Sequence, residues 1–118
     1  MQDASWTPQD ADDLRIDAFG GVLLITAAGT TCCDAERLDS HLRDVEKGSR
    51  AVVLDLTSVE ELDEGVVEIL RFAWRRLGER LRVVAVPGGG PAQALKRAGL
   101  RRFAIHQTLS GALALAAA

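Results

Sequence analysis

The stretch from Ala51 to Leu77 constrains the fold most, because its apolar residues change from strand-like to helix-like spacing across a short acidic turn. From Ala51 to Leu56 the residues are aliphatic and nearly free of charge, with Asp55 near the end of the run. Such a run is typical of a strand buried on both faces of a parallel sheet. The sequence therefore predicts a strand that leads, through the turn, into a helix.

The predicted helix has one apolar and one polar face. Its apolar residues recur at helical spacing and form a stripe, which consists of Val66, Ile69, Leu70, Ala73 and Leu77. Asp63 stands at the expected N-cap, where a carboxylate accepts hydrogen bonds from free backbone N–H groups. The opposite face carries Gly65, Glu68, Phe72, Arg76 and Glu79. Phe72 is the one large apolar residue there, although single exposed aromatic residues are common.

The remainder of the chain alternates strands with helices. Apolar stretches at 14–19 and 22–27 flank Gly20-Gly21 and predict an antiparallel hairpin. Further elements are predicted in chain order: a helix opened by a capping box at Thr31 and Asp34 and closed by Gly48, a strand at 82–86, a helix between the loop at 87–91 and Gly99, a strand at 103–106 and a helix at 109–117. This order predicts an α/β sandwich with a mostly parallel sheet of four to five strands and about four helices.

The length of 118 residues allows one domain, which can bury a sufficient core without disulfides or metal. We assign 1–118 to a single domain, with 1–13 as a flexible N-terminal segment. Cys32 and Cys33 are adjacent and therefore poorly placed for an ordinary disulfide with each other. The N-terminus has no signal-peptide pattern, and no apolar run approaches the ~20 residues of a membrane span. We therefore expect a soluble cytoplasmic protein that does not insert into membranes.

Two separated segments resemble one family. Val52 to Asp63 reads VVLDLTSVEELD, where STAS domains, the anti-sigma factor antagonists of bacteria and their relatives, typically read VVLDLSGVxFID. Leu95 to Leu113 reads LKRAGLRRFAIHQTLSGAL and is similar to the family's closing helix, GL, F-x-I and final AL positions. The chain resembles STAS domains over roughly 14–117, and the resemblance implies the same α/β sandwich.

The chain departs from this family at the junction between strand and helix. Family members that act as phosphorylation switches carry Asp-Ser-Ser-Gly there, and a partner kinase, itself an anti-sigma factor, modifies the second serine. This chain reads DEGV from Asp63 to Val66. Aligned without a gap, Gly65 takes the acceptor position, whereas a one-residue deletion places Glu64 there. Neither alignment leaves a hydroxyl at the acceptor position.

The two alignments have opposite consequences. A phosphoserine at a helix N-terminus carries a charge of about −2, which repels an acidic or apolar partner surface. A permanent glutamate at the acceptor position implies a released state, and a glycine implies constant competence to bind. The alignment without a gap keeps the family's spacing and is favoured. Thr57 and Ser58 are weak alternative acceptors, because hydroxyls in turns commonly bond the nearby backbone.

The resemblance implies a protein-binding module without enzymatic activity, cofactor or metal. We predict its binding surface at Asp63, Glu64, Gly65, Glu68 and Phe72. The implied partner is an anti-sigma factor that is also a serine kinase, and its capture releases a sigma factor. The alternative is a STAS-like accessory subunit of an ABC-type lipid transporter or a stress-signalling scaffold, which uses the fold without obligatory phosphorylation. The oligomeric state is left open, a homodimer included.

Other functional classes fit the sequence less well. A response-regulator receiver needs an acidic pair after its first strand to hold Mg²⁺, but Asp12-Asp13 precede that strand. The glycines at 88–90 lack the Lys-Ser/Thr of a P-loop. His41 and His106 are expected at the solvated surface and not in catalysis. A net charge of −3 argues against a dedicated nucleic-acid binder.

Overall fold

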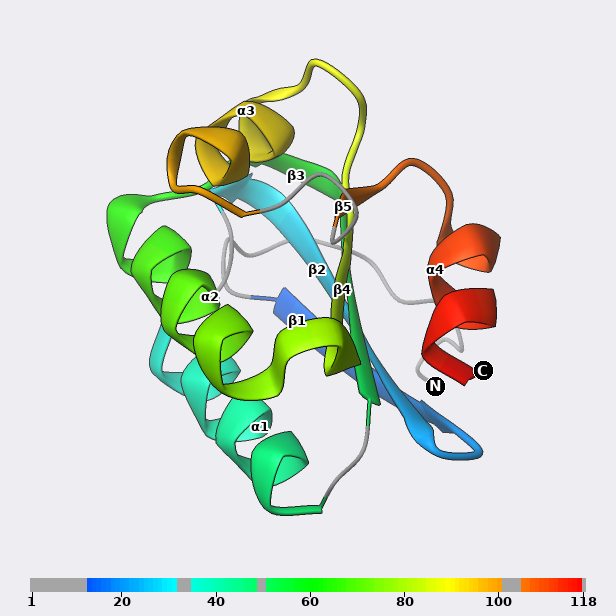
Figure 1. Ribbon diagram of the computed structural model, residues 1–118. Coiled ribbons are helices and arrows are strands. Elements are labelled where there is room, and N and C mark those ends of the chain that lie inside the picture. Colours follow the sequence, from blue (N-terminus) through cyan, green and yellow to red (C-terminus); the bar gives the residue numbers. More distant parts are fainter. Residues whose placement is uncertain (1–12, 32–34, 49–50, 101–104, 118) are drawn as a thin grey trace, which may run out of the picture.

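The computed structural model describes residues 13–31, 35–48, 51–100 and 105–117. Within them, helices cover a single five-stranded sheet (Figure 1). The elements in chain order are β1 (Asp13–Phe19), β2 (Val22–Thr31), α1 (Ala35–Gly48), β3 (Ala51–Glu61), α2 (Glu64–Leu77), the 3-10 turn η1 (Gly78–Arg80), β4 (Leu81–Val84), α3 (Gly90–Arg97), β5 (Ile105–His106) and α4 (Leu109–Ala117). The predicted order of strands and helices is confirmed.

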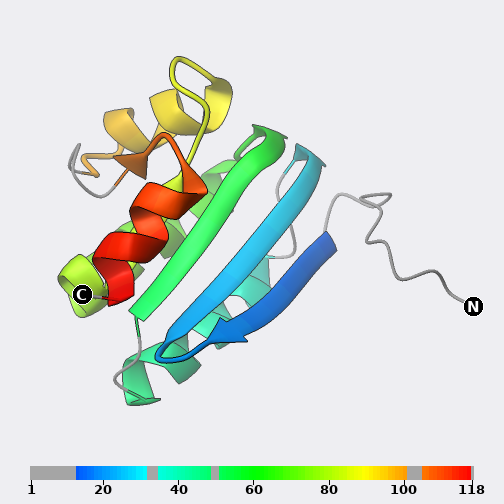
Figure 2. The ribbon, with the colours of Figure 1, turned by 90° about the vertical axis from the view of Figure 1, so that its right-hand side faces the viewer.

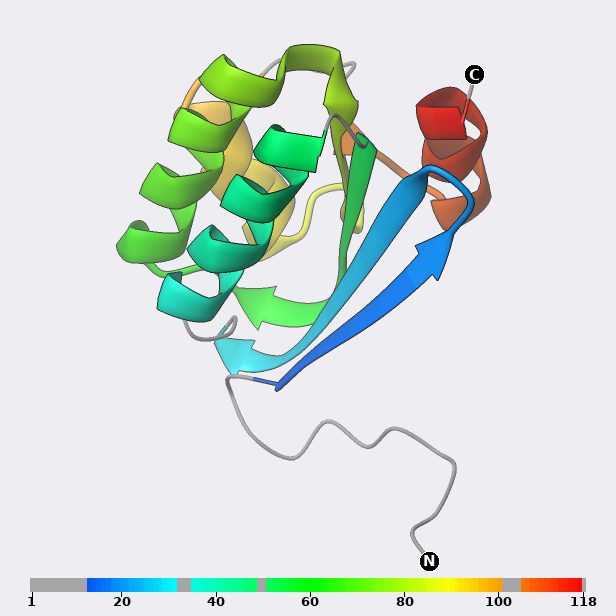
Figure 3. The same cartoon turned by 90° about the horizontal axis from the view of Figure 1, so that it is seen from below.

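The strands lie side by side in chain order, β1-β2-β3-β4-β5. β1 is antiparallel to β2 across a turn in which Gly20 has a φ of 60°, a conformation that favours glycine. All later neighbours are parallel, as predicted. Crossovers between parallel strands are right-handed, and α1, α2 and α3 each move the chain one strand onward in the same direction. These helices therefore lie toward the same face, with α1 and α2 side by side (Figure 3).

The apolar side chains form a core on each face of the sheet. The larger cluster joins the sheet to α1, α2 and α3, and its fully buried members include Ile25, Leu38, Leu42, Leu54, Leu70 and Leu95. The smaller cluster lies under α4 and consists of Val22, Leu24, Val53, Val84 and Ala112. Figure 2 shows α4 along the face opposite α1 and α2. The central strand β3 contributes to both clusters, as its nearly uncharged sequence predicts.

The central strand extends further than predicted. The sequence places its end at Leu56, but β3 continues to Glu61. The additional half of β3 pairs with the end of β2, where Ala28 lies opposite Ser58 after a shift of register. Backbone hydrogen bonding between strands does not require apolar side chains, so the hydrophobic pattern of the sequence does not predict this extension of β3. Through the same pairing β2 continues to Thr31, so the predicted capping box at Thr31 is wrong. β4 begins and ends earlier than predicted.

Several predictions concern residues outside the described ranges. Both cysteines and the residues at 103–104 of the last predicted strand belong to this group, as does the predicted N-terminal segment except for Asp13. Asp13 itself begins β1, so that predicted segment is one residue too long. Among the helices in the described ranges, none combines the length and the apolar character needed to cross a membrane.

Candidate functional site

The predicted binding surface begins where β3 leads into α2, at the edge of the sheet formed by the carboxyl ends of the parallel strands (Figure 1). Asp63 has an extended backbone, with φ −81° and ψ 168°, and its Oδ1 accepts a hydrogen bond of 2.9 Å from the backbone N–H of Val66. Asp63 is therefore the N-cap of α2, as predicted. Glu64 and Gly65 then occupy the first turn of α2, where the helix dipole favours negative charge.

Replacing Asp63 with alanine is expected to lower the free energy of unfolding by about 1 kcal/mol, because a backbone N–H of α2 loses its acceptor. Urea unfolding followed by circular dichroism measures this change. Glu64→Ala is the matched control, since the Glu64 side chain has no hydrogen bond or ion pair with the described residues. Its expected loss is below about 0.5 kcal/mol. Equal losses in both variants would contradict the assigned cap.

The two faces of α2 differ as the sequence predicts. The buried residues of the helix are Val66, Leu70, Ala73 and Leu77. Gly65, Glu68 and Phe72 face solvent, and Phe72 is 46% exposed. The guanidinium carbons of Arg71 and Arg75 each lie 5.9 Å from the centre of the Phe72 ring, at the outer range of a cation–π contact. Phe72 is thus a large apolar surface residue held between two cations.

Carboxylates gather around the start of α2. The exposed members are Glu60, Glu61, Asp63, Glu64 and Glu68. Glu68 forms an ion pair of 2.7 Å with Arg71, one turn along the same helix. An exposed pair of this kind adds little to stability. The exposed surface around the start of α2 therefore keeps a local negative field.

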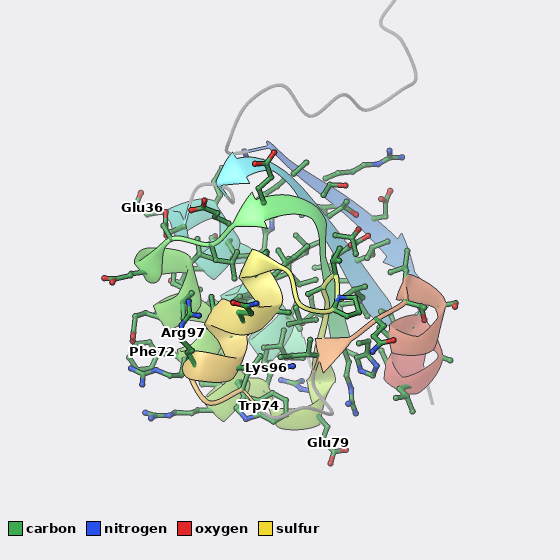
Figure 4. The ribbon with its side chains drawn as sticks, turned by 90° about the horizontal axis from the view of Figure 1, so that it is seen from above. Glu36, Phe72, Trp74, Glu79, Lys96 and Arg97 are labelled. Atoms are coloured by element: carbon green, nitrogen blue, oxygen red, sulfur yellow. The ribbon has the colours of Figure 1, made fainter. Side chains whose placement is uncertain are left out.

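A depression of about 430 Å³, which we name the α2–α3 groove, lies beside these carboxylates. Its lining residues are Leu62 from the segment between β3 and α2, Glu64, Val67 and Glu68 from the start of α2, and Ala94, Arg97 and Ala98 from the end of α3 and its C-cap. In Figure 4, Arg97 lies on the side of α3 that faces α2, the side on which Phe72 is also found. Sequence reasoning missed this second wall, because helical periodicity does not reveal which helix lies beside another.

A glycine positions α3 at this site. A Cβ atom at Gly90 would lie 2.6 Å from the backbone oxygen of Glu60, which is closer than non-bonded atoms approach. Gly90 therefore allows the start of α3 to lie directly against the end of β3. This close approach gives a structural reason for the last glycine of the run at 88–90, and it requires no phosphate ligand.

The two weak alternative phosphoacceptors lie on a strand. Thr57 and Ser58 belong to β3 and are exposed. The Thr57 hydroxyl donates a hydrogen bond of 2.7 Å to Oδ1 of Asp55, and the Thr57 backbone N–H donates one of 3.0 Å to the same oxygen. Their predicted position in a turn is wrong because β3 continues through them.

His106 differs from the solvated histidine that the sequence predicts. It lies partly buried on β5, and its buried Nε2 has no hydrogen-bond partner within the described residues. On the adjacent strand, Val84 pairs with His106, and Arg82 lies two residues earlier on the same face. Burial first, and then the positive charge of Arg82, lower the pKa of His106 below its usual value of 6.5. Folding therefore favours the neutral imidazole.

Stability is expected to fall as the pH drops below about 6.5, because the unfolded chain then takes up a proton at His106 that the folded protein resists. Above that pH the imidazole is neutral in both the folded and the unfolded state, so His106 no longer affects the free energy of unfolding. Urea unfolding at pH 5.5 and 7.5 measures the difference in the free energy of unfolding between the two pH values. The substitution His106→Gln is expected to reduce this difference. If His106→Gln shows the same difference between the two pH values as the wild type, His106 is not the source of the pH dependence.

Solved structures of similar fold match nearly the whole chain. An anti-sigma factor antagonist from Mycobacterium paratuberculosis is 26% identical, with a TM-score of 0.75 over 90% of this chain and 94% of that chain. A candidate anti-sigma factor antagonist from Thermotoga maritima is 14% identical, with a TM-score of 0.69 over 89% and 95%. The unphosphorylated anti-sigma factor antagonist SpoIIAA is 9% identical, with a TM-score of 0.63 over 86% and 94%. No protein-family model and no curated protein sequence matches.

Proposed function

Because this chain has the STAS fold of the anti-sigma factor antagonists, we propose that it is a non-enzymatic module that binds an anti-sigma factor with a kinase-like ATP-binding fold. The observation that carries the proposal is the likeness to the Mycobacterium antagonist, at 26% identity over 90% of this chain. Exposure of the predicted surface supports it, since Asp63, Glu64, Gly65, Glu68 and Phe72 are all open to solvent. Capture of the anti-sigma factor at this surface would release a sigma factor.

In this proposal the module remains competent to bind because no phosphate can be added at the start of α2. Gly65 occupies the acceptor position of the favoured alignment, and it is exposed. Among the described residues, a Cβ atom at Gly65 would meet only Oδ1 of Asp63, at an ordinary contact distance of 3.4 Å. The position therefore accepts a side chain without disturbing the fold, and this allows the alignment to be tested directly.

The decisive experiment measures binding to each purified kinase-like anti-sigma factor of the source organism by calorimetry. Gly65→Asp adds a charged side chain in the first turn, which the helix dipole tolerates but which a docked partner must desolvate, and it is expected to weaken binding about tenfold. Glu64→Ser removes one carboxylate of the predicted surface, so it is expected to weaken binding less than Gly65→Asp does and not to become phosphorylated. In the presence of ATP, Gly65→Ser should become phosphorylated by the partner, whereas the wild type should not.

The outcomes distinguish a failure of the proposed function from a failure of the alignment that places Gly65 at the acceptor position. The function is wrong if none of these anti-sigma factors binds the wild-type protein. The alignment is wrong if Glu64→Ser binds more tightly than the wild type and becomes phosphorylated while Gly65→Asp binds as the wild type does and Gly65→Ser is not phosphorylated. In that case Glu64 occupies the acceptor position, as the alignment with a deletion requires.

A second candidate function is that of an accessory subunit of an ABC-type lipid transporter or a stress-signalling scaffold. The absence of a hydroxyl at both Glu64 and Gly65 favours it, because this class uses the fold without obligatory serine phosphorylation. Co-purification of the tagged protein with a transporter ATPase, and not with an anti-sigma factor, would support this alternative.

A further inference from the structure

We propose that the α2–α3 groove seats a helical segment of the partner that carries an aliphatic side chain between a basic and an acidic residue. This inference rests on the proposed function, because it assumes a protein partner docked at the start of α2. It adds a second wall to the binding surface, formed by Ala94, Arg97 and Ala98, and it specifies the chemistry of the occupant.

The lining of the groove is part apolar and part polar, and we name its apolar residues the floor. Its apolar lining residues are Leu62, Val67, Ala94 and Ala98, all of which are partly exposed. The small side chains from the α3 wall border a depression of about 430 Å³, a size within the range of ligand-binding clefts. Covering this floor with an aliphatic side chain removes apolar surface from water on both partners.

The rims of the groove carry opposite charges. Glu64 lies on the α2 rim and Arg97 on the α3 rim, and neither side chain has a hydrogen bond or ion pair with the residues that the structure describes. Glu68, also on the α2 rim, is already paired with Arg71 at 2.7 Å. A complementary occupant therefore presents a basic residue to Glu64 and an acidic residue to Arg97.

These charges fix the direction of the bound segment. On a helix, residues three or four positions apart lie on one face, so an aliphatic residue with a base on one side and an acid on the other at this spacing fits the groove. Glu64 and Arg97 also stabilise the ends of their own helices, since each lies at the terminus that favours its charge. If stabilising the helix ends were their only role, substitutions of these two residues would change the stability of the protein, but a ligand would show no preferred order of charges.

The test uses the whole chain of 118 residues and a displayed library of helical peptides with random surface residues. Selection against the immobilised wild type is expected to enrich peptides with the aliphatic residue and the two flanking charges in one order. Ala94→Trp, which fills the groove, should weaken the selected peptide at least about tenfold. Lys96→Glu is the matched control, because Lys96 is absent from the lining of the groove and lines a separate depression with Ile105 and Gln107.

A charge exchange tests the same site without filling it. In the double variant Glu64→Lys, Arg97→Glu, the selected peptide should lose roughly tenfold in affinity, and a peptide with its two charges exchanged should regain that loss. Thermal unfolding of each variant confirms that the fold is retained. Restoration by the exchanged peptide cannot arise from a general loss of stability.

Several results would overturn the inference: no enriched sequence, peptides insensitive to Ala94→Trp, or no reversal in the double variant. Self-association of the wild type that Ala94→Trp abolishes would overturn it in favour of a second copy as occupant. If an anti-sigma factor binds wild type and Ala94→Trp equally, the proposed function holds and the groove assignment fails. If the groove selects the expected peptides but no anti-sigma factor binds, the partner class is wrong and the groove assignment holds.

Discussion

Replacing Leu70 with alanine is expected to lower the free energy of unfolding by about 2–5 kcal/mol. Leu70 is fully buried between α2 and the sheet, where it belongs to the larger apolar cluster. Its truncation removes apolar surface from the core and leaves a cavity that the surrounding strands cannot fill. Because small domains are stable by about 5–15 kcal/mol, this loss is a large fraction of the total. Urea unfolding followed by circular dichroism measures it.

The matched control lies two residues further along the same helix. Phe72 is 46% exposed, so Phe72→Ala is expected to change the free energy of unfolding by less than about 0.5 kcal/mol. The contrast tests whether α2 is oriented as described. A loss in Phe72→Ala as large as that in Leu70→Ala would show that the aromatic side chain is buried and would remove it from the binding surface.

The orientation of α2 could be predicted from the sequence because a local period determines it. Residues at helical spacing share a face whatever the rest of the chain does, and the apolar stripe that contains Val66 and Leu70 is buried as expected. The N-cap at Asp63 is equally local, since donor and acceptor lie three residues apart. The alternation of strands and helices then restricts the topology strongly, because crossovers have one hand.

The features that the sequence did not reveal depend on contacts between distant segments. β3 extends to Glu61 because β2 pairs with it, and Gly90 is required because α3 lies against the backbone oxygen of Glu60. The partial burial of His106 arises from its place beside β4, and Arg97 joins the candidate site only through the position of α3 next to α2. Neither the composition nor the hydrophobic periodicity of the sequence indicates these contacts between distant segments.

The consequence for the candidate site is that the sequence located its first wall and missed its second. The five predicted residues all lie at the start and on the outer face of α2, because the family pattern and the helical period both refer to that segment. Ala94, Arg97 and Ala98 have ordinary helical spacing and no distinctive motif. Their contribution becomes visible only when the groove is described in three dimensions.

Phe72→Ala is expected to weaken binding of the anti-sigma factor roughly 30-fold, or about 2 kcal/mol, as truncation of a central aromatic contact commonly does. Phe72 presents a large apolar ring near the carboxylates at the start of α2, and Arg71 and Arg75 flank that ring. Burial of the ring against a partner requires little ordering, because an aromatic side chain has few rotatable bonds. Calorimetry or surface plasmon resonance measures the loss, most of which should appear as faster dissociation.

Leu115→Ala provides the control for removal of an exposed apolar side chain. Leu115 is 53% exposed and belongs to α4, on the opposite face of the sheet from α2 (Figure 2). Its truncation removes a comparable apolar surface at a distance from the proposed contact, so the affinity should stay within about twofold of the wild type. If Leu115→Ala weakens binding and Phe72→Ala does not, the partner docks on the α4 face, and the surface at the start of α2 has another role.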